Sequence, residues 1–266
     1  DFQKFYSLTT SQFERELKEE LAPAGDPFAR LQKIIKSYKF TEYEEYYITL
    51  YQLRDNEQLK LGVNSRLDQQ PVKLQLNSIR SNMYVSFLTS GGSSIGHLLG
   101  LVYTKQGGRW RLSALNCRDY AYHGQTAVDY YSQAQKLAQQ GATVPAYLYT
   151  SVVKELSPPS NFLSYSQQDK FKQLRQELST KIAEELPQQL KVKSISTVPE
   201  IFRLEVENLD QGLAAVIKYK TSISLNNTDK LKEEADRLTE DIDGFFPGLK
   251  DNFDYLVYQI YGKQKA

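Results

Sequence analysis

Residues 98–115 read LLGLVYTKQGGRWRLSAL, and this stretch decides how the first half of the chain folds. Its two arms are mostly apolar or β-branched, and Gln106-Gly107-Gly108 separates them. A glycine turn between two such arms is the pattern of an antiparallel β-hairpin. We therefore predict strands over 98–105 and 110–115.

The alternation of side chains continues upstream of this hairpin. From Tyr46 the period is two residues, which indicates strands rather than helices. The further strands predicted here cover 46–53, 59–63, 72–76 and 83–88. Before them, two segments, 9–22 and 27–38, have an apolar stripe at helical spacing. Ser11 is a candidate N-cap within the first segment, and Asp26 is a candidate N-cap just before the second. The order predicts a helix hairpin followed by an antiparallel meander.

Downstream of the hairpin, two helices and then a second block of mixed elements are expected. Helices are predicted over 124–140 and 143–156, and Ser157-Pro158-Pro159-Ser160-Asn161 is the clearest linker pattern in the chain. The second block should contain a helix over 168–185, strands over 190–195, 201–206 and 214–222, a helix over 228–241, and a final strand or short helix over 253–261.

These elements predict an α+β protein of two domains, each a mostly antiparallel sheet packed by helices. The first domain, with the helix hairpin, the meander and the closing helices, covers 1–156. The linker covers 157–165, and a smaller α+β domain covers 166–266.

Composition excludes several classes of function. The 33 basic and 32 acidic residues give a net charge of +1, which lacks the positive surface that nucleic-acid binding needs. No run of about 18 apolar residues is present, so no transmembrane segment is expected. The single Cys allows no internal disulfide or thiolate cluster, and the two His show no ligand spacing, so neither a metal nor a cofactor is expected.

The chain begins at Asp1 rather than Met, which favours a signal peptide that has been removed. Its high content of Tyr, Gln and Asn resembles that of exported proteins and lipoproteins of Bacteroidetes-type bacteria. We therefore expect an exported protein of the periplasm or cell surface, and a lipid anchor before residue 1 stays open.

The first domain resembles NTF2-like (cystatin-like α+β) domains. The resemblance rests on the order of helix hairpin and meander, and on the late hairpin 102–112, VYTKQGGRWRL, whose turn is followed by Trp, a basic residue and Leu. It covers about 9–117. Such domains curve a sheet around helices and leave a conical pocket, but the family's third helix has no counterpart between the early strands. The family includes enzymes, binding proteins and scaffolds, so the resemblance does not decide the function.

Three patterns carry candidate catalytic residues. Gly92-Ser93-Ser94-Ile95-Gly96 matches a nucleophile elbow, although a strand rather than a helix is predicted after it. His97 would serve as an acid or base, or as a structural hydrogen-bonding group. Asp119 and His123 would form an acid–base dyad, but capping of the helix expected at Gly124 accounts for them better.

The junction after the hairpin gathers other notable side chains. Cys117 is interpreted as a small, buried and unreactive residue. Aromatic side chains with polar tips suit contacts with glycans, peptides or proteins, although packing at half-buried sites explains them as well. The candidate ligand-binding residues are Tyr103, Trp110, Tyr120, Tyr122 and Tyr131.

The sequence as a whole favours a non-catalytic exported protein that binds a small ligand or a protein partner. The first domain would supply the pocket, from the hairpin and residues 117–131. Two alternatives remain. One is an enzyme with an NTF2-like pocket that uses His97 or the Asp119/His123 pair, and the other is a structural assembly subunit that pairs through a sheet edge or its C-terminal strand.

Overall fold

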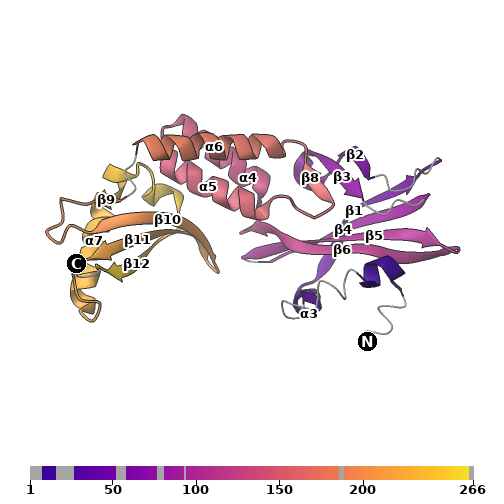
Figure 1. The fold of residues 1–266 in the computed structure, drawn as a ribbon, viewed down its shortest axis with the longest axis horizontal. Helices are drawn as coiled ribbons and strands as arrows, with labels where there is room; N and C mark the ends of the chain where they lie inside the picture. The colour runs from indigo at the N-terminus through magenta and orange to yellow at the C-terminus, as the bar shows by residue number, and fades with distance from the viewer. Residues whose placement is uncertain are drawn as a thin grey trace. The chain divides into compact units, whose positions relative to one another are not determined.

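The computed structural model describes residues 8–15, 27–51, 58–76, 81–92, 94–185 and 189–263 (Figure 1). Helices and several antiparallel sheets make up these residues, which confirms the predicted α+β class. The chain separates into two compact units. Unit 1 consists of 1–126 and 156–168, and unit 2 consists of 127–155 and 169–266.

This division differs from the predicted boundary at 157–165. Residues 163–165 form strand β8 (Leu163–Tyr165), which pairs antiparallel with β3 (Pro71–Leu76). Leu163 and Tyr165 are buried, so the segment belongs to the core of unit 1 although its Ser- and Pro-rich start reads as a linker. The helices α4 (Ala127–Gln139) and α5 (Thr143–Leu156) lie in the predicted first domain but belong to unit 2.

Unit 1 contains a five-stranded and a three-stranded antiparallel sheet. The larger sheet has the order β1-β4-β5-β6-β7, and the smaller has the order β2-β3-β8. The remaining elements of this unit are α3 (Pro27–Ser37), β1 (Phe40–Thr49), β2 (Leu59–Asn64), the 3-10 turn η1 (Leu67–Gln69), β4 (Asn82–Ser90), β5 (Ile95–Gln106), β6 (Arg109–Tyr122) and β7 (Gln125–Thr126).

The two faces of the five-stranded sheet are covered differently. Met83, Val85 and Phe87 alternate along β4 and are fully buried, because their face packs against the smaller sheet. On that side the Phe87 ring lies 5.8 Å from the ring of Phe162, which precedes β8. Helix α3 lies on the opposite side of the sheet (Figure 1), and the ring of Tyr38, just after this helix, packs against that of His97.

The predicted hairpin is present, and its strands are longer than expected. Gly107 and Gly108 have φ angles of 55° and 79°, the left-handed region that a two-residue hairpin turn of type I′ requires at both positions. β6 continues to Tyr122, so the junction residues after Leu115 belong to the sheet. Of the predicted helix 9–22, residues 11–15 are helical, and Thr9 instead forms a β-bridge with Leu112. Residues 16–22 lie outside the described residues, as do Asp26 and the predicted turn at Asp55.

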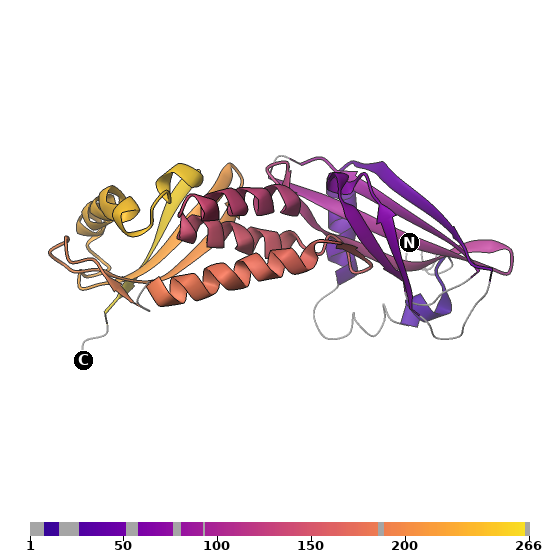
Figure 2. The ribbon, with the colours of Figure 1, turned by 90° about the horizontal axis from the view of Figure 1, so that it is seen from above.

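Unit 2 combines helices with a four-stranded sheet of order β12-β11-β10-β9. Figures 1 and 2 show α4, α5 and α6 side by side. Its elements are α4 (Ala127–Gln139), α5 (Thr143–Leu156), α6 (Gln168–Glu185), β9 (Leu190–Lys191), β10 (Glu200–Leu209), β11 (Gly212–Thr221), α7 (Thr228–Phe245), the 3-10 turn η2 (Lys250–Asn252) and β12 (Tyr255–Gly262).

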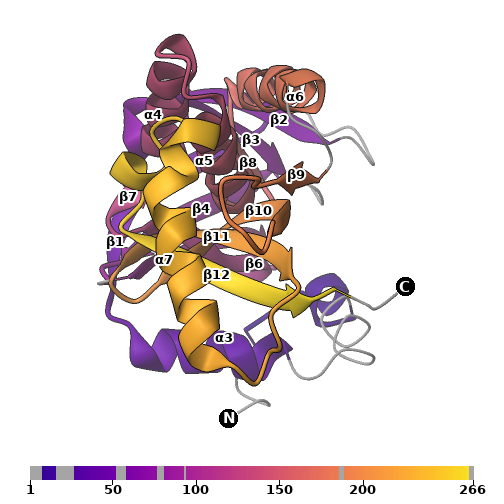
Figure 3. The same ribbon diagram turned by 90° about the vertical axis from the view of Figure 1, so that its left-hand side faces the viewer.

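Helix α7 packs on the sheet of unit 2, as Figure 3 shows from the side. Leu231, Leu238 and Ile242 form its buried stripe, and the Asn227 side chain caps its first turn by accepting a bond from the backbone N–H of Lys230. β12 runs parallel to β11, which makes the last segment a strand rather than a short helix. The strand predicted over 190–195 is only the short β9, and α4 begins at Ala127, after β7.

Candidate functional site

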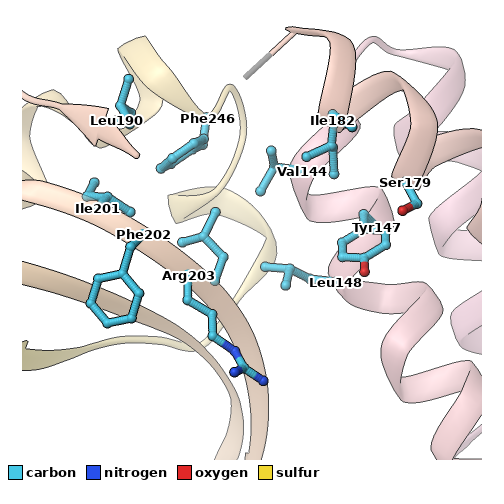
Figure 4. Close-up of a pocket in the computed structure, with 12 residues that line it drawn as sticks. Val144, Tyr147, Leu148, Ser179, Ile182, Leu190, Ile201, Phe202, Arg203 and Phe246 are labelled. Atoms are coloured by element: carbon cyan, nitrogen blue, oxygen red, sulfur yellow. The ribbon is translucent and has the colours of Figure 1, made fainter. Parts of the chain in front are cut away.

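A cavity of about 390 Å³ lies within unit 2 and is the candidate ligand site (Figure 4). Five segments surround it, namely α5, α6, β9, β10 and the turn after α7. Its lining consists of Val144, Tyr147, Leu148, Ser179, Ile182, Ala183, Leu190, Ile201, Phe202, Arg203, Leu204 and Phe246. The volume falls within the range of small-molecule sites in proteins.

Helical spacing explains how α5 and α6 line the cavity. Val144 and Leu148 are four residues apart on α5, and Ser179 is followed by Ile182 and Ala183 on α6. Residues three or four apart lie on the same side of a helix. Figure 4 shows Val144, Ile182 and Phe246 approaching one another from three elements, while the ring of Phe202 points away from them.

Polar groups are few and belong to α5, α6 and β10. The Tyr147 hydroxyl accepts a hydrogen bond from Arg175 Nη2 at 3.3 Å, and the Arg175 guanidinium also lies 4.7 Å from the centre of the Tyr147 ring. Ser179 adds a second hydroxyl to the lining. Tyr147 is therefore held in place from outside the cavity, while its ring forms part of the wall.

Arg203 supplies the positive charge of the site. Its side chain is 64% exposed and forms an ion pair with Glu205, which also binds Lys218 at 2.6 Å. The hydrogen bond from Lys218, together with the charge of Arg203, lowers the pKa of Glu205. Two cations thus share one carboxylate, which leaves net positive charge beside the cavity. An apolar interior with a cationic rim can bind a molecule that has an apolar body and an anionic end.

The structure brings together His97 and Asp119, which belong to two separate catalytic candidates in the sequence. They are opposite each other on β5 and β6, and His97 Nδ1 lies 3.1 Å from Asp119 Oδ1. The His97 ring meets the Tyr38 ring edge-on at 4.6 Å, and the residue is 5% exposed. A histidine packed in this way is positioned as part of the core, with a carboxylate to orient it.

The other catalytic candidates lie in turns or strands. β5 begins at Ile95, within the Gly92–Gly96 motif, so Ser94 precedes a strand and not the helix that a nucleophile elbow requires. His123 has a φ of 49° in the turn between β6 and β7, and Asp119 lies within β6. The capping role expected for both residues required a helix that starts at Gly124. The helix α4 instead starts at Ala127, after β7, so neither residue lies directly before it. Cys117 forms no disulfide and is half-buried rather than buried.

Two of the candidate ligand-binding residues, Tyr103 and Trp110, lie on the same face of the five-stranded sheet. The pairing register places Tyr47, Tyr84 and Tyr103 side by side on β1, β4 and β5. The Trp110 ring lies 6.1 Å from that of Tyr47 and 6.4 Å from that of Tyr84. We call Tyr47, Tyr84, Tyr103 and Trp110 the aromatic row.

The remaining three candidates are buried. Tyr120 donates a hydrogen bond of 2.6 Å to Asp68, which also accepts one from Tyr165. Burial, the neighbouring Tyr165 and the Asp68 carboxylate raise the pKa of Tyr120. Tyr122 is 4% exposed at the end of β6, and Tyr131 packs its ring 4.6 Å from that of Phe171 in unit 2.

The residues that line the unit 2 cavity were absent from the sequence-based candidates. Part of the signal was present in the sequence. Ile182 continues an apolar stripe of the predicted helix 168–185 with Leu174 and Leu178, and Val144 and Leu148 belong to an apolar segment. That stripe indicates burial but not the empty volume beside it. Arg203 carried no signal, since a lone Arg in a strand is ordinary.

Among the described residues, no group of three or more His, Cys, Asp or Glu side chains is placed to hold a metal ion. Within the same ranges, no helix is long and apolar enough to span a membrane. Comparison of the chain with family models, with curated proteins and with solved structures finds no match.

Proposed function

We propose that the protein binds an amphipathic small molecule in the unit 2 cavity and does not catalyse a reaction there. The observation that carries this proposal is the cavity of about 390 Å³, whose lining is mostly apolar and whose rim holds Arg203. Among the lining residues, Tyr147 and Arg203 are the only titratable side chains. Neither supplies the carboxylate or imidazole that acid–base chemistry commonly uses.

The ligand class follows from the same lining. Val144, Leu148 and Ile182 offer surface to a hydrocarbon or ring system, and burial of that surface drives binding. The Arg203 guanidinium suits a carboxylate or sulfonate at one end. The ligand therefore combines an apolar body with a single anionic group. Export to the periplasm or cell surface is part of the proposal, and the Tyr-, Gln- and Asn-rich composition supports it.

Binding of 1-anilinonaphthalene-8-sulfonate, an apolar ring system with a sulfonate, tests the site. The natural chain should bind this dye with saturable fluorescence, and decanoate should displace it. Ala183→Trp should weaken dye binding at least tenfold, because the new ring fills the cavity. Glu184→Trp is the matched control, since it places the same ring on the next residue of α6, which is exposed and outside the lining.

A second comparison tests the anionic end. Arg203→Gln should weaken displacement by decanoate and leave displacement by decan-1-ol unchanged, because only the carboxylate interacts with the guanidinium. If Ala183→Trp binds the dye as well as the Glu184→Trp control, the cavity is not the binding site.

The enzymatic alternative has one observation in its favour, the distance of 3.1 Å between His97 and Asp119. Burial of the imidazole against Tyr38 supports a structural role instead. Replacement of His97 by Asn should therefore change stability rather than abolish a function. The resemblance to NTF2-like domains remains a prediction for unit 1.

A further inference from the structure

The aromatic row forms an open platform on unit 1, separate in sequence and in structure from the unit 2 cavity. Tyr47 is 61% exposed and Trp110 is 41% exposed, although both are large aromatic residues. Directly paired residues of neighbouring strands share a sheet face, and the register pairs Tyr47 with Tyr84 and Tyr84 with Tyr103. Trp110 shares this face because it pairs with Lys105, two residues after Tyr103 on β5.

The rings of the platform hold one another in fixed orientations. The Trp110 ring meets Tyr47 at an interplanar angle of 74° and Tyr84 at 61°, and the rings of Tyr84 and Tyr103 are 6.4 Å apart. These are the edge-to-face arrangements and spacings that aromatic pairs prefer. A ligand that stacks on such rings needs to order few side chains, which favours binding.

Hydrogen-bonding groups surround the rings. The Tyr47 hydroxyl donates to Asn82 Oδ1 at 3.1 Å, and the Thr49 hydroxyl donates to the same oxygen at 3.4 Å. Glu45 accepts a hydrogen bond from Tyr84 on the same face. The amide N–H groups of Asn82 and the second oxygen of Glu45 extend the polar edge of the platform.

Length and charge select among ligands. Neighbouring strands are about 4.8 Å apart, so the row from β1 to β5 spans about 10 Å, the length of two linked sugar rings. Two exposed acids, Glu42 and Glu45, lie on the β1 side of the rings, and an exposed base, Lys105, lies on β5 and pairs directly with Trp110. Opposite charges at the two ends favour neither an anionic nor a cationic polymer.

We propose that the aromatic row binds a neutral oligosaccharide. The faces of a sugar ring carry C–H groups that pack on aromatic rings, and its rim carries hydroxyls that pair with amides and carboxylates. The platform offers both kinds of contact at the spacing of consecutive sugar units. This site lies outside the unit 2 cavity, and its occupant differs from the amphipathic ligand proposed there.

Trp110 is the only Trp of the chain, so its fluorescence reports directly on the platform. The full-length protein should be titrated with cellopentaose, maltopentaose, mannopentaose and chitopentaose. At least one of them should shift the emission saturably. Tyr47→Ala should weaken that binding at least tenfold, and Trp110→Ala should abolish it in a calorimetric titration.

Tyr255→Ala is the matched control, because Tyr255 is a Tyr with similar exposure to Trp110 on a strand of unit 2. This variant, and Ala183→Trp in the cavity, should bind the sugar as the natural chain does. The proposal is overturned if none of the four sugars binds at millimolar concentration, or if Tyr47→Ala binds unchanged. Tighter binding of polygalacturonate than of any neutral sugar would overturn it as well, and would assign the face to an anionic polymer.

Discussion

The aromatic row of unit 1 and the cavity of unit 2 expose apolar surface in opposite ways. The row stands on the open face of a sheet, where Tyr47 and Trp110 keep a large part of their surface in water. The cavity is a hollow between several elements, and Leu148 and Val144 in its wall are 1% and 5% exposed. An open face selects ligands by stacking and edge contacts, whereas a concave site also selects them by size and shape.

Substitutions in the two regions should therefore differ in how strongly they change ligand binding and how strongly they change stability. A ring on an open face makes few contacts within its own unit, so its removal should affect a ligand more than the fold. A side chain in the cavity wall is part of the core, so its removal should affect both. Four substitutions test this contrast, one in the wall of the cavity and three in the five-stranded sheet of unit 1.

Leu148→Ala should have the largest effect. It removes a buried side chain from the wall of the cavity and should lower the free energy of unfolding by about 2–5 kcal/mol. Urea unfolding followed by circular dichroism measures this loss. The enlarged cavity should still bind the naphthalene dye, and sugar binding by unit 1 should not change. A loss as small as that of a surface substitution would mean that this wall is not part of the core.

Gly100→Val should come second. A Cβ atom at Gly100 would lie 2.6 Å from Phe162 Cζ and 3.1 Å from Phe87 Cε1. Overpacking of this kind costs about 1–3 kcal/mol. Trp110 fluorescence during urea unfolding reports the change in unit 1. Gly62→Val is the control, since nothing lies within 4 Å of its Cβ position, and its stability should equal or exceed that of the natural chain.

Trp110→Ala should cost about 1 kcal/mol, because it removes two edge-to-face ring contacts at a site that is already partly in water. Thermal unfolding by circular dichroism measures it, since the variant has no Trp. The contrast with Leu148→Ala should be clear: a small change in stability accompanies a complete loss of sugar binding. A cost above that of Gly100→Val would place Trp110 in the core.

The smallest effect concerns the titration of Tyr84. Its hydrogen bond with Glu45, together with burial, raises its pKa from 10.0 to about 12. The unfolded chain therefore releases this proton at a lower pH than the folded chain, and the corresponding stabilisation is present below about pH 10 and lost as the pH rises to about 12. Glu45→Gln should move the pKa of Tyr84 back toward 10.0.

Tyrosinate absorbance, measured with and without Tyr84→Phe, isolates the contribution of this one residue. If Glu45→Gln leaves the titration of Tyr84 unchanged, then burial and not the carboxylate holds the proton. The polar edge of the aromatic row would then lack one of its members.

The elements of the fold were largely predictable because their patterns are local. The Gly107-Gly108 turn and the alternation of Met83, Val85 and Phe87 depend on neighbours in sequence, and the structure contains both. The division into units differs from the predicted boundary at 157–165 for a physical reason. Pro158 and Pro159 begin a segment whose Phe162 and Leu163 pack beneath strands far away in the chain, and composition does not report such partners.

The candidate sites divide in the same way. Tyr103 and Trp110 were identified from one hairpin, but their neighbours Tyr47 and Tyr84 required the register of three strands. The cavity requires still more, because its wall combines Val144, Ile182 and Phe246 from separate elements. Each of these residues reads as core in its own segment, and only their packing leaves a space between them.

The pairing of β8 with β3 has a consequence for how the protein is made. The ribosome synthesises the chain from its N-terminus, so α4 and α5 are made before residues 163–165. The three-stranded sheet cannot be completed until those residues, which form β8, have been made. Until then the site that Phe162 fills beside Gly100 stands empty, and unit 1 carries exposed strand edges. A shorter gene that ends at residue 156 would fix the chain in that unfinished state, and it should yield an aggregating product.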